Sequence, residues 1–334
     1  MVHVIIFCML LISVILFVSY RSAAGIRKNQ RMNTTLPYEF LKHPDVTAIT
    51  EKFKKVNLIF FLISVIGTLP TFFINYTSLS LLYLVIWMGF NFVIGNRLYC
   101  RYNSKLILLK SKNRWFPEPY LYHELDGSCQ IKRPMFIKKL YPSPMDRLLA
   151  ETDQPIYIDE DEHWINGYYF NPENRRTTVE KRMGAGTTAN LATKSGLFSI
   201  YGAIVLMTIV FGWIIILFIS MDFSDFKMMI GDKKVEIDAP MYDYDFMLSD
   251  ITEIRLSETL PEHGARTNGA ATNTYYLGNF RFASYGSSKM YVYKEYPPYI
   301  VIKLTDKTVF FNSKSAKETQ EYYKKLLEKK EAID

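Results

Sequence analysis

The sequence predicts a membrane protein with four transmembrane α-helices followed by a separate C-terminal α+β domain. Two observations predict this fold class: four apolar stretches without Asp, Glu, Lys, Arg or His, and a final third in which apolar and polar residues alternate. As helices, the four stretches come close to or exceed the roughly 30 Å hydrocarbon core of a bilayer, at about 1.5 Å per residue. They are residues 4–20, 56–74, 79–94 and 197–221.

The charges beside these stretches predict the topology. Residues 21–55 carry 8 Lys and Arg against 3 Asp and Glu, residues 97–196 carry 16 against 12, and residues 222–334 carry 16 against 18. Lys and Arg near membrane helices mark the cytoplasmic side. We therefore expect a multi-pass protein of the cell membrane whose N-terminus and C-terminal domain are extracytoplasmic. The cations nearest the helices are Arg21, Arg27, Lys28 and Arg31, then Lys52, Lys54 and Lys55, then Arg97, Arg101 and Lys105.

The first apolar stretch is interpreted as a permanent anchor. The alternative is a cleaved signal peptide, for which the small residues 22–25 would supply a cleavage site, but the stretch lacks a basic beginning and is followed by Arg and Lys. Membrane orientation explains the net charge of +7, and without a basic patch we expect no nucleic-acid partner. The expected partners are the lipid bilayer and a membrane or envelope protein.

The sequence predicts no catalytic residue, cofactor or metal site. The five histidines lie in five separate segments, and the cysteines, Cys8, Cys100 and Cys129, form no CxxC pair. The run DEDEH at 159–163 is interpreted as a solvated acidic linker rather than a metal site, because consecutive side chains cannot all face one ion. The GAG at 184–186 lacks phosphate-loop spacing and is interpreted as a loop or helix start before the fourth membrane helix.

The region after the third apolar stretch is expected to contain short extended pieces rather than a large core. The apolar run LILL at 106–109 is interpreted as a strand. Prolines interrupt the region at positions 117, 119, 134, 142 and 144.

Residues 163–192 read HWINGYYFNPENRRTTVEKRMGAGTTANLA. This stretch resembles a bacterial signature, domain of unknown function 5808. Glu180 and Thr187 depart from that pattern. The matching residues are Trp164, Gly167, Tyr169, Phe170, Asn171, Pro172, Glu173, Lys181, Arg182, Gly184, Gly186 and Asn190.

The resemblance implies a multi-pass membrane protein of Gram-positive bacteria with no assigned chemistry. Residues 34–54 resemble a segment before a helix pair in the same group. Members of the family with domain of unknown function 5808 often carry a second region, domain of unknown function 1648, which is related to the membrane part of peptide-toxin immunity proteins.

The same stretch supplies candidate site residues for a membrane interface or a partner. In one interpretation, the rings lie at the headgroup boundary and the cations contact lipid phosphates. In the other, the aromatic residues pack a small cytoplasmic subdomain. The residues are Trp164, Tyr168, Tyr169, Phe170, Lys181 and Arg182.

The C-terminal domain, residues 222–334, is long enough for one core. Its apolar or alternating runs are separated by Gly, Pro and Asp turn signals, which favours an antiparallel sheet or barrel. After the last run, Ser315 and Glu318 form a capping box, and a helical stripe closes the domain. The seven predicted strands lie at 234–238, 242–248, 251–257, 275–286, 288–294, 299–304 and 308–312.

This order of strands and one final helix is similar to a pleckstrin-homology (PH) domain. Residues 266–326 resemble bacterial PH domains fused to membrane helices, chiefly through YKEYPPYI at 293–300 and FFNSK at 310–314. The resemblance implies an antiparallel barrel capped by one helix. Residues 235–260 contain no cluster of Lys and Arg, so phosphoinositide binding is not expected.

The segment GARTNGAATN at 264–273 is small and polar, and it contains the second candidate site: Arg266, Asn268 and Gly269. Its exposed backbone amides would suit a ligand or partner. A plain flexible hairpin loop is the favoured interpretation.

Three function classes follow. We favour a non-catalytic membrane scaffold or sensor whose barrel binds a protein, peptide or envelope component. The second is an immunity or resistance protein against a membrane-active peptide toxin, which rests on the resemblance of the helix pair. The third is an ectoenzyme, which the absence of a catalytic motif disfavours.

Overall fold

The computed structural model describes residues 2–118, 121–125, 148–150, 152, 154–165, 168–182, 186–262 and 264–333. The chain forms two compact units. One contains residues 6–70 and 84–211, and the other contains residues 1–5, 71–83 and 212–334.

Within these residues, four helices are long and apolar enough to cross a membrane, which confirms the four predicted apolar helices. They are α1 (Val2–Ala23), α2 (Pro44–Ile66), α3 (Thr77–Asn113) and α6 (Lys194–Phe223). Helix α2 begins where the ring nitrogen of His43 accepts the amide of Asp45 at 3.3 Å. It ends four residues before Pro70, which lies in the 3₁₀ turn η2 (Leu69–Phe73), as expected where proline removes a helical donor.

Helix α3 continues for 19 residues beyond Ile94, through Asn113. The predicted strand at 106–109 is therefore wrong, because these residues are helical. A short apolar run fits a strand or a buried helix turn equally well, and here Leu106 and Ile107 are both buried in separate apolar clusters.

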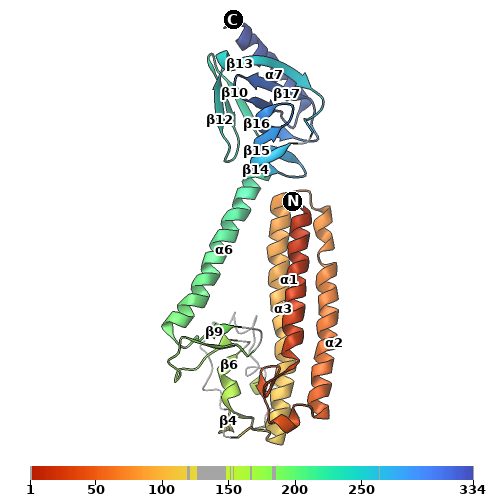
Figure 1. The fold of residues 1–334 in the computed structure, drawn as a ribbon, viewed down its shortest axis with the longest axis vertical. Coiled ribbons are helices and arrows are strands. Elements are labelled where there is room, and N and C mark those ends of the chain that lie inside the picture. Colours follow the sequence, from red (N-terminus) through yellow and green to blue (C-terminus); the bar gives the residue numbers. More distant parts are fainter. Residues whose placement is uncertain are drawn as a thin grey trace. The chain divides into compact units, whose positions relative to one another are not determined.

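Helices α1, α2 and α3 run beside one another (Figure 1). Polar side chains connect them: the Ser13 and Ser64 hydroxyls lie 2.9 Å apart, and the Asn57 amide donates to the Phe17 carbonyl at 3.1 Å. The Trp87 ring N–H of α3 donates to the Ser64 carbonyl of α2 at 3.3 Å. Such hydrogen bonds supply specificity between helices that lipid surrounds.

The same unit contains a polar region that we call the membrane-proximal region, residues 24–43, 97–125 and 154–193. It joins the end of α3 to short strands and 3₁₀ turns. These are β1 (Ile26–Arg27), β2 (Gln30–Arg31), β3 (Thr34–Thr35), η1 (Tyr38–Phe40), β4 (His123–Glu124), β5 (Tyr157–Ile158), η3 (Glu160–His163), β6 (Trp164–Ile165), β7 (Tyr168–Tyr169), β8 (Thr178–Glu180) and β9 (Thr187–Ala189). Strands β1–β3 form one sheet, and β4–β5, β6–β7 and β8–β9 each pair antiparallel.

The C-terminal domain has two sheets and one helix, α7 (Ala316–Glu331), visible in Figure 1. The first sheet contains β10 (Lys227–Ile230), β11 (Lys234–Asp238) and β12 (Tyr244–Met247). The second has the order β13-β17-β18-β16-β15-β14. Its strands are β13 (Ile251–Ser257), β14 (Ala265–Ala271), β15 (Tyr275–Phe282), β16 (Gly286–Tyr293), β17 (Tyr299–Leu304) and β18 (Thr308–Phe311).

This arrangement confirms a sheet-rich domain with a final helix but corrects its details. The described strands form two sheets rather than one closed barrel, and β16 pairs with β18 in parallel. The seven predicted runs correspond to β11, β12, β13 and β15–β18, whereas β10 and β14 were missed. Strand β10 has the sequence KMMI, in which the apolar residues are adjacent rather than alternating, and β14 has the small polar sequence ARTNGAA, which does not alternate either.

The core of the C-terminal domain follows the predicted alternation. Val235 and Ile237 on β11 are buried, while the residues between and beside them are exposed. Helix α7 adds Leu326, which is fully buried. The Ser315 hydroxyl accepts the amide of Glu318 at 3.4 Å, but the Glu318 carboxylate binds the Ser313 hydroxyl, so only one half of the predicted capping box forms.

Candidate functional site

A buried ionic cluster lies in the membrane-proximal region. The ammonium of Lys110, on the extended part of α3, contacts the carboxylates of Asp159 at 2.6 Å and Asp161 at 2.7 Å. All three side chains are at most 2% exposed. Buried charges of this kind persist only when they are paired, so the two carboxylates hold the 159–163 segment against α3.

Asp161 connects this cluster to two further segments. Its carboxylate accepts the backbone amide of Thr35 at 3.1 Å and the Thr35 hydroxyl at 2.9 Å. It also pairs with Arg182, whose guanidinium donates to the Asn33 carbonyl at 2.9 Å. The interpretation of 159–163 as a solvated linker is therefore wrong, because Asp159 and Asp161 are the buried anions that join four parts of the chain.

The two aspartates have opposite pKa shifts. Burial, together with the negative charge of Asp161, raises the pKa of Asp159 to about 6. Burial also opposes ionisation of Asp161, but the positive charges of Lys110 and Arg182 outweigh it and lower the pKa of Asp161 to about 2. Asp161 is thus the permanent anion of the cluster, and Asp159 is the group that titrates near neutral pH.

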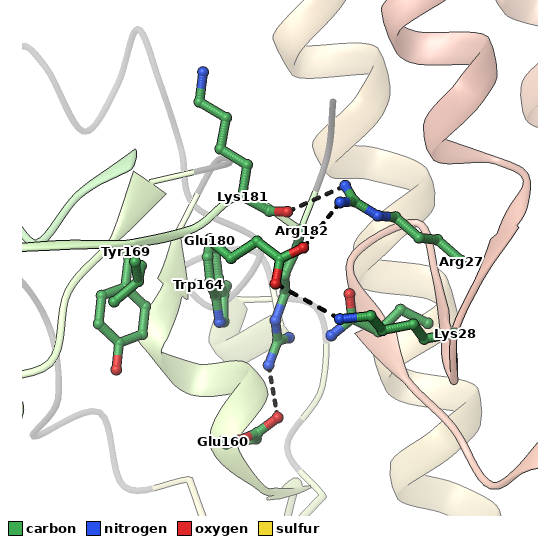
Figure 2. Close-up of a pocket in the computed structure, with 10 residues that line it drawn as sticks. Arg27, Lys28, Glu160, Trp164, Tyr169, Glu180, Lys181 and Arg182 are labelled. Atoms are coloured by element: carbon green, nitrogen blue, oxygen red, sulfur yellow. Dashed lines mark hydrogen bonds and ion pairs between the residues drawn. The ribbon is translucent and has the colours of Figure 1, made fainter. Parts of the chain in front are cut away.

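A pocket of about 240 Å³ lies beside this cluster. Its labelled side chains come from the β1–β2 hairpin, from η3, from strands β6, β7 and β8, and from the two residues after β8 (Figure 2). We call it the basic–aromatic pocket. Its lining residues are Arg27, Lys28, Gln30, Glu160, Trp164, Tyr169, Val179, Glu180, Lys181 and Arg182.

Glu180 forms ion pairs between the two sides of the pocket. Its carboxylate lies 3.1 Å from the guanidinium of Arg27 and 3.6 Å from the ammonium of Lys28, as Figure 2 shows. Arg27 also donates to the backbone carbonyl of Lys181 at 3.2 Å. The Glu180 side chain is 65% exposed, so these pairs lie at the rim of the pocket.

Arg182 forms the inner wall of the pocket. Its guanidinium lies 4.9 Å from the centre of the Trp164 ring, which is a cation–π contact, and it pairs with Glu160 at 3.0 Å. The Trp164 ring in turn packs at 5.0 Å from that of Tyr169. Only 5% of the Arg182 side chain is exposed, so its position is set by Asp161, Glu160 and Trp164 together.

The structure therefore brings together Trp164, Tyr169 and Arg182 of the first predicted set. Lys181 contributes its backbone carbonyl, and its side chain extends away from the ion pairs in Figure 2. Phe170 does not line the pocket; its amide donates to the His163 carbonyl at 2.8 Å. Tyr168 lies on β7, paired with Ile165, and its side chain is outside the described part of the structure.

Sequence reasoning missed Arg27, Lys28, Glu160 and Glu180 as pocket residues. Arg27 and Lys28 contributed only to the topology prediction, and Glu180 stood out only as a departure from the signature. The sequence offers no signal that joins them: the tight turn at Lys28, whose φ is a left-handed 52°, is seen only in the structure, and no pattern indicates which distant segment it meets.

Two asparagines of the signature build the segment behind the pocket. The fully buried Asn190 accepts the amide of Asn171 at 3.1 Å and donates to the carbonyls of Asn171 at 2.9 Å and Asn174 at 2.7 Å. The Asn171 carboxamide oxygen accepts the amide of Glu173 at 2.9 Å, which forms the turn. These bonds hold Asn190 against the turn at residues 171–174. Gly167 and Gly184 of the signature lie outside the described residues.

The second predicted set lies in the other unit and is not a loop. Arg266, Asn268 and Gly269 belong to the edge strand β14 and pair with Phe280, Asn279 and Gly278 of β15. A side chain on Gly269 would approach the Leu277 carbonyl to 2.2 Å, so glycine permits the close approach of these strands. The flexible-hairpin interpretation is therefore wrong, because the segment is a strand with a bulge between Arg266 and Asn268.

The same unit contains a segment that we call the joint, residues 222–226. It consists of the last two residues of α6 and the three residues that connect α6 to β10. The Asp222 carboxylate accepts the amide of Ser78, in the first turn of α3, at 2.7 Å. The Phe226 ring stacks on the ring of Tyr293, with 4.5 Å between the ring centres, and Phe226 is 3% exposed. The Tyr293 hydroxyl accepts the Phe226 amide and donates to the Ser224 carbonyl, each at 3.1 Å.

Within the described residues, no group of three His, Cys, Asp or Glu side chains is placed to hold a metal ion. Neither the basic–aromatic pocket nor the joint contains a nucleophile paired with a base. The chemistry that both regions offer is binding through charge, rings and hydrogen bonds.

Residues 226–327 match the model of a family described as Bacterial PH domain. The match begins at the end of the joint and ends inside α7. It supports the PH-like assignment of the C-terminal domain. No curated protein and no solved structure matches the chain. The resemblance of residues 163–192 to domain of unknown function 5808 stays a prediction.

Proposed function

We propose that this chain is a non-catalytic scaffold or sensor of the cell membrane, in which the PH-like domain binds a protein, peptide or envelope component. The observation that carries the proposal is the joint. Only Ser224, Asp225 and Phe226 separate α6 from β10, and each has a partner in the C-terminal unit. Asp225 pairs with Lys314 at 2.8 Å, and the other two bind Tyr293.

A domain that merely needs an anchor is served by a flexible linker. This joint instead fixes the domain to the end of α6, and Asp222 fixes the same point to the start of α3. Binding to the PH-like domain would then act directly on the ends of two apolar helices. That arrangement supports a sensor over a passive tether.

Site-specific photo-crosslinking in the native host tests the binding role. A photoreactive amino acid is placed in the full chain at exposed positions on separate faces: Met229 on β10, Thr267 on β14 and Lys324 on α7. We expect one discrete partner, captured from one face and not from the opposite one. Crosslinks to lipid or to the chain itself at every position would refute the proposal.

The joint separates a sensor from a scaffold. Inserting Gly-Ser-Gly-Ser after Asp225 leaves both the helices and the PH-like strands intact but loosens their connection. For a sensor, the captured partner persists while the phenotype of a deletion strain is no longer complemented. For a scaffold, both are retained.

The predicted sidedness has its own test. A reporter active only in the cytosol is fused after Asp334, and we expect no signal because the charge distribution predicts that the domain lies outside. A bright reporter would place the PH-like domain in the cytoplasm and restrict its partners to cytosolic ones.

A further inference from the structure

The carboxylate of Glu180 is an anion that the protein itself supplies to the basic–aromatic pocket. Glu180 lies between Arg27 and Lys28, yet its side chain is 65% exposed, and those of Arg27 and Lys28 are 42% and 72% exposed. Exposed ion pairs contribute only ~0–1 kcal/mol each. A second anion of suitable shape can therefore displace the Glu180 carboxylate at little energetic cost.

The charges of the pocket favour such an anion. Its lining contains four cations, Arg27, Lys28, Lys181 and Arg182, and two carboxylates. Glu160 is held by Arg182 at 3.0 Å, so Arg27 and Lys28 are the pair that displacement of Glu180 would expose. An arginine fork and a neighbouring ammonium match the tetrahedral oxygens of a phosphate group.

The place of the pocket in the chain indicates where the phosphate comes from. Arg27 follows the last residue of α1, Ala23, by four residues, a span of at most ~14 Å even when extended. The two headgroup layers together add roughly 10–15 Å to the hydrocarbon core, so a single layer is about 5–8 Å thick and lies within the reach of this span. Trp164 and Tyr169, which line the same pocket, belong to the residue types enriched at that depth.

The size of the pocket is consistent with a headgroup. Its 240 Å³ is smaller than the roughly 300–1,000 Å³ of sites that enclose a drug-sized ligand. A phosphate with its glycerol carbons enters such a space, and the acyl chains remain outside it.

We propose that the basic–aromatic pocket binds the phosphate of an anionic phospholipid, with Arg27 and Lys28 taking the phosphate in place of Glu180. This site belongs to the membrane-proximal region and is separate from the PH-like domain, so the proposal goes beyond the proposed function and neither depends on the other. Glu180 then acts as a built-in competitor that sets the affinity.

The test uses the purified full chain in a non-ionic detergent, titrated with dioctanoyl phosphatidylglycerol. Tryptophan fluorescence is the readout, and subtraction of the same titration on Trp164→Phe isolates the pocket signal. Dioctanoyl phosphatidylcholine, inorganic phosphate and glycerol 3-phosphate form the other arms. We expect saturable binding of phosphatidylglycerol and at least about tenfold weaker binding of the other three, because phosphatidylcholine has no net charge and the two soluble phosphates do not partition into the detergent micelle.

Three variants make the test specific. Arg27→Gln/Lys28→Gln should weaken phosphatidylglycerol binding at least about tenfold. The charge-matched control, Lys52→Gln/Lys55→Gln, removes two exposed cations of α2 outside the pocket and should stay within about twofold. Glu180→Gln removes the competitor and should tighten binding by about two- to tenfold.

Glu180→Gln separates a binding role from a structural one, because loss of a purely structural ion pair would weaken binding or leave it unchanged. Either of those results would overturn the proposal, as would equal effects of the pocket and control double variants or non-saturable binding by the wild type. Glycerol 3-phosphate or inorganic phosphate binding as tightly as the lipid would overturn the lipid source and assign the pocket to a soluble phosphate.

Discussion

The largest fully buried side chains differ between the membrane-proximal region and the PH-like domain. Both sets contain large apolar or aromatic side chains, such as Tyr99 and Leu106 in the first and Tyr275 and Phe311 in the second, but the first also includes Lys110, beside two buried carboxylates. The membrane-proximal region therefore adds ion pairs between segments far apart in the chain to its apolar clusters, whereas the PH-like interior depends on apolar residues that alternate along strands. The comparison teaches that one chain can use two kinds of interior, with different sensitivities to mutation and pH.

The largest expected effect is the loss of the central cation. Lys110→Met leaves Asp159 and Asp161 buried without their shared partner, which we expect to destabilise the membrane-proximal region by about 3–5 kcal/mol. Limited proteolysis of the full chain would show faster cleavage within residues 154–193. Lys112→Met, at an exposed position two residues along α3, should leave cleavage unchanged. Equal protection of the two variants would show that the ionic cluster is not what holds this region.

The corresponding change in the PH-like domain is Leu277→Ala. Leu277 is fully buried in the larger apolar cluster, so truncation should cost about 2–5 kcal/mol through lost burial and a cavity. Thermal unfolding of the full chain, followed by near-ultraviolet circular dichroism, measures it. Met229→Ala, 54% exposed on β10, is the control and should cost less than about 0.5 kcal/mol. A Leu277→Ala effect no larger than the control would contradict an apolar interior here.

The two interiors should also differ in their response to pH. Because the pKa of Asp159 is raised to about 6, the folded chain keeps a proton between about pH 4 and 6 that the unfolded chain has released. The contribution of Asp159 to stability therefore falls as the pH rises through this window. The pKa of Asp161 is lowered to about 2, so its own stabilisation is complete above about pH 4.5 and is lost only at lower pH.

Asp159→Asn isolates this effect, since the amide cannot titrate. The stability of the wild type relative to Asp159→Asn should decline by about 1–3 kcal/mol between pH 4.5 and 7.5, whereas that of Leu277→Ala relative to the wild type should not change over the same range. Protease resistance of residues 154–193 across this pH range is the measurement. A pH-independent difference would show that Asp159 does not titrate in this window.

The smallest expected effect concerns the joint. Tyr293→Phe keeps the ring that stacks on Phe226 but removes the hydroxyl that binds Ser224 and Phe226, at a cost of about 0.5–1.5 kcal/mol. Hydrogen exchange of the Phe226 amide measures it directly. The control is Tyr296→Phe: Tyr296 is 44% exposed, so loss of its hydroxyl should leave the exchange of the Phe226 amide unchanged. Unchanged exchange in Tyr293→Phe would mean that the hydroxyl does not order the joint.

The same contrast decides what the sequence could predict. The PH-like strands were found because apolar residues at every second position indicate a half-buried strand, as in Val235 and Ile237. The four apolar helices were found because the length of an uncharged apolar stretch alone indicates them. Strand β14 escaped because Gly269 and Ala270 carry no alternation; its place in the sheet depends on the close backbone approach to Gly278.

The ionic cluster could not be predicted because its members carry no periodic signal. Asp161 meets Thr35 across 126 positions and Lys110 across 51. Each member taken alone resembles an ordinary surface charge, and composition favours that interpretation. The pocket residues Trp164, Tyr169 and Arg182 were found as a group only because they lie in one short stretch. Arg27 and Lys28 were not found with them because they belong to the β1–β2 hairpin, which is far away in the sequence.

The joint has a consequence for chain length. Only three residues, each with a partner, connect α6 to β10. One amino acid added within α6 would therefore rotate the attached domain by about 100° around the helix axis, and seven would return it to nearly its original orientation. Complementation of the deletion strain, plotted against insert length, would then oscillate with the period of an α-helix. A tethered domain would instead tolerate every length alike.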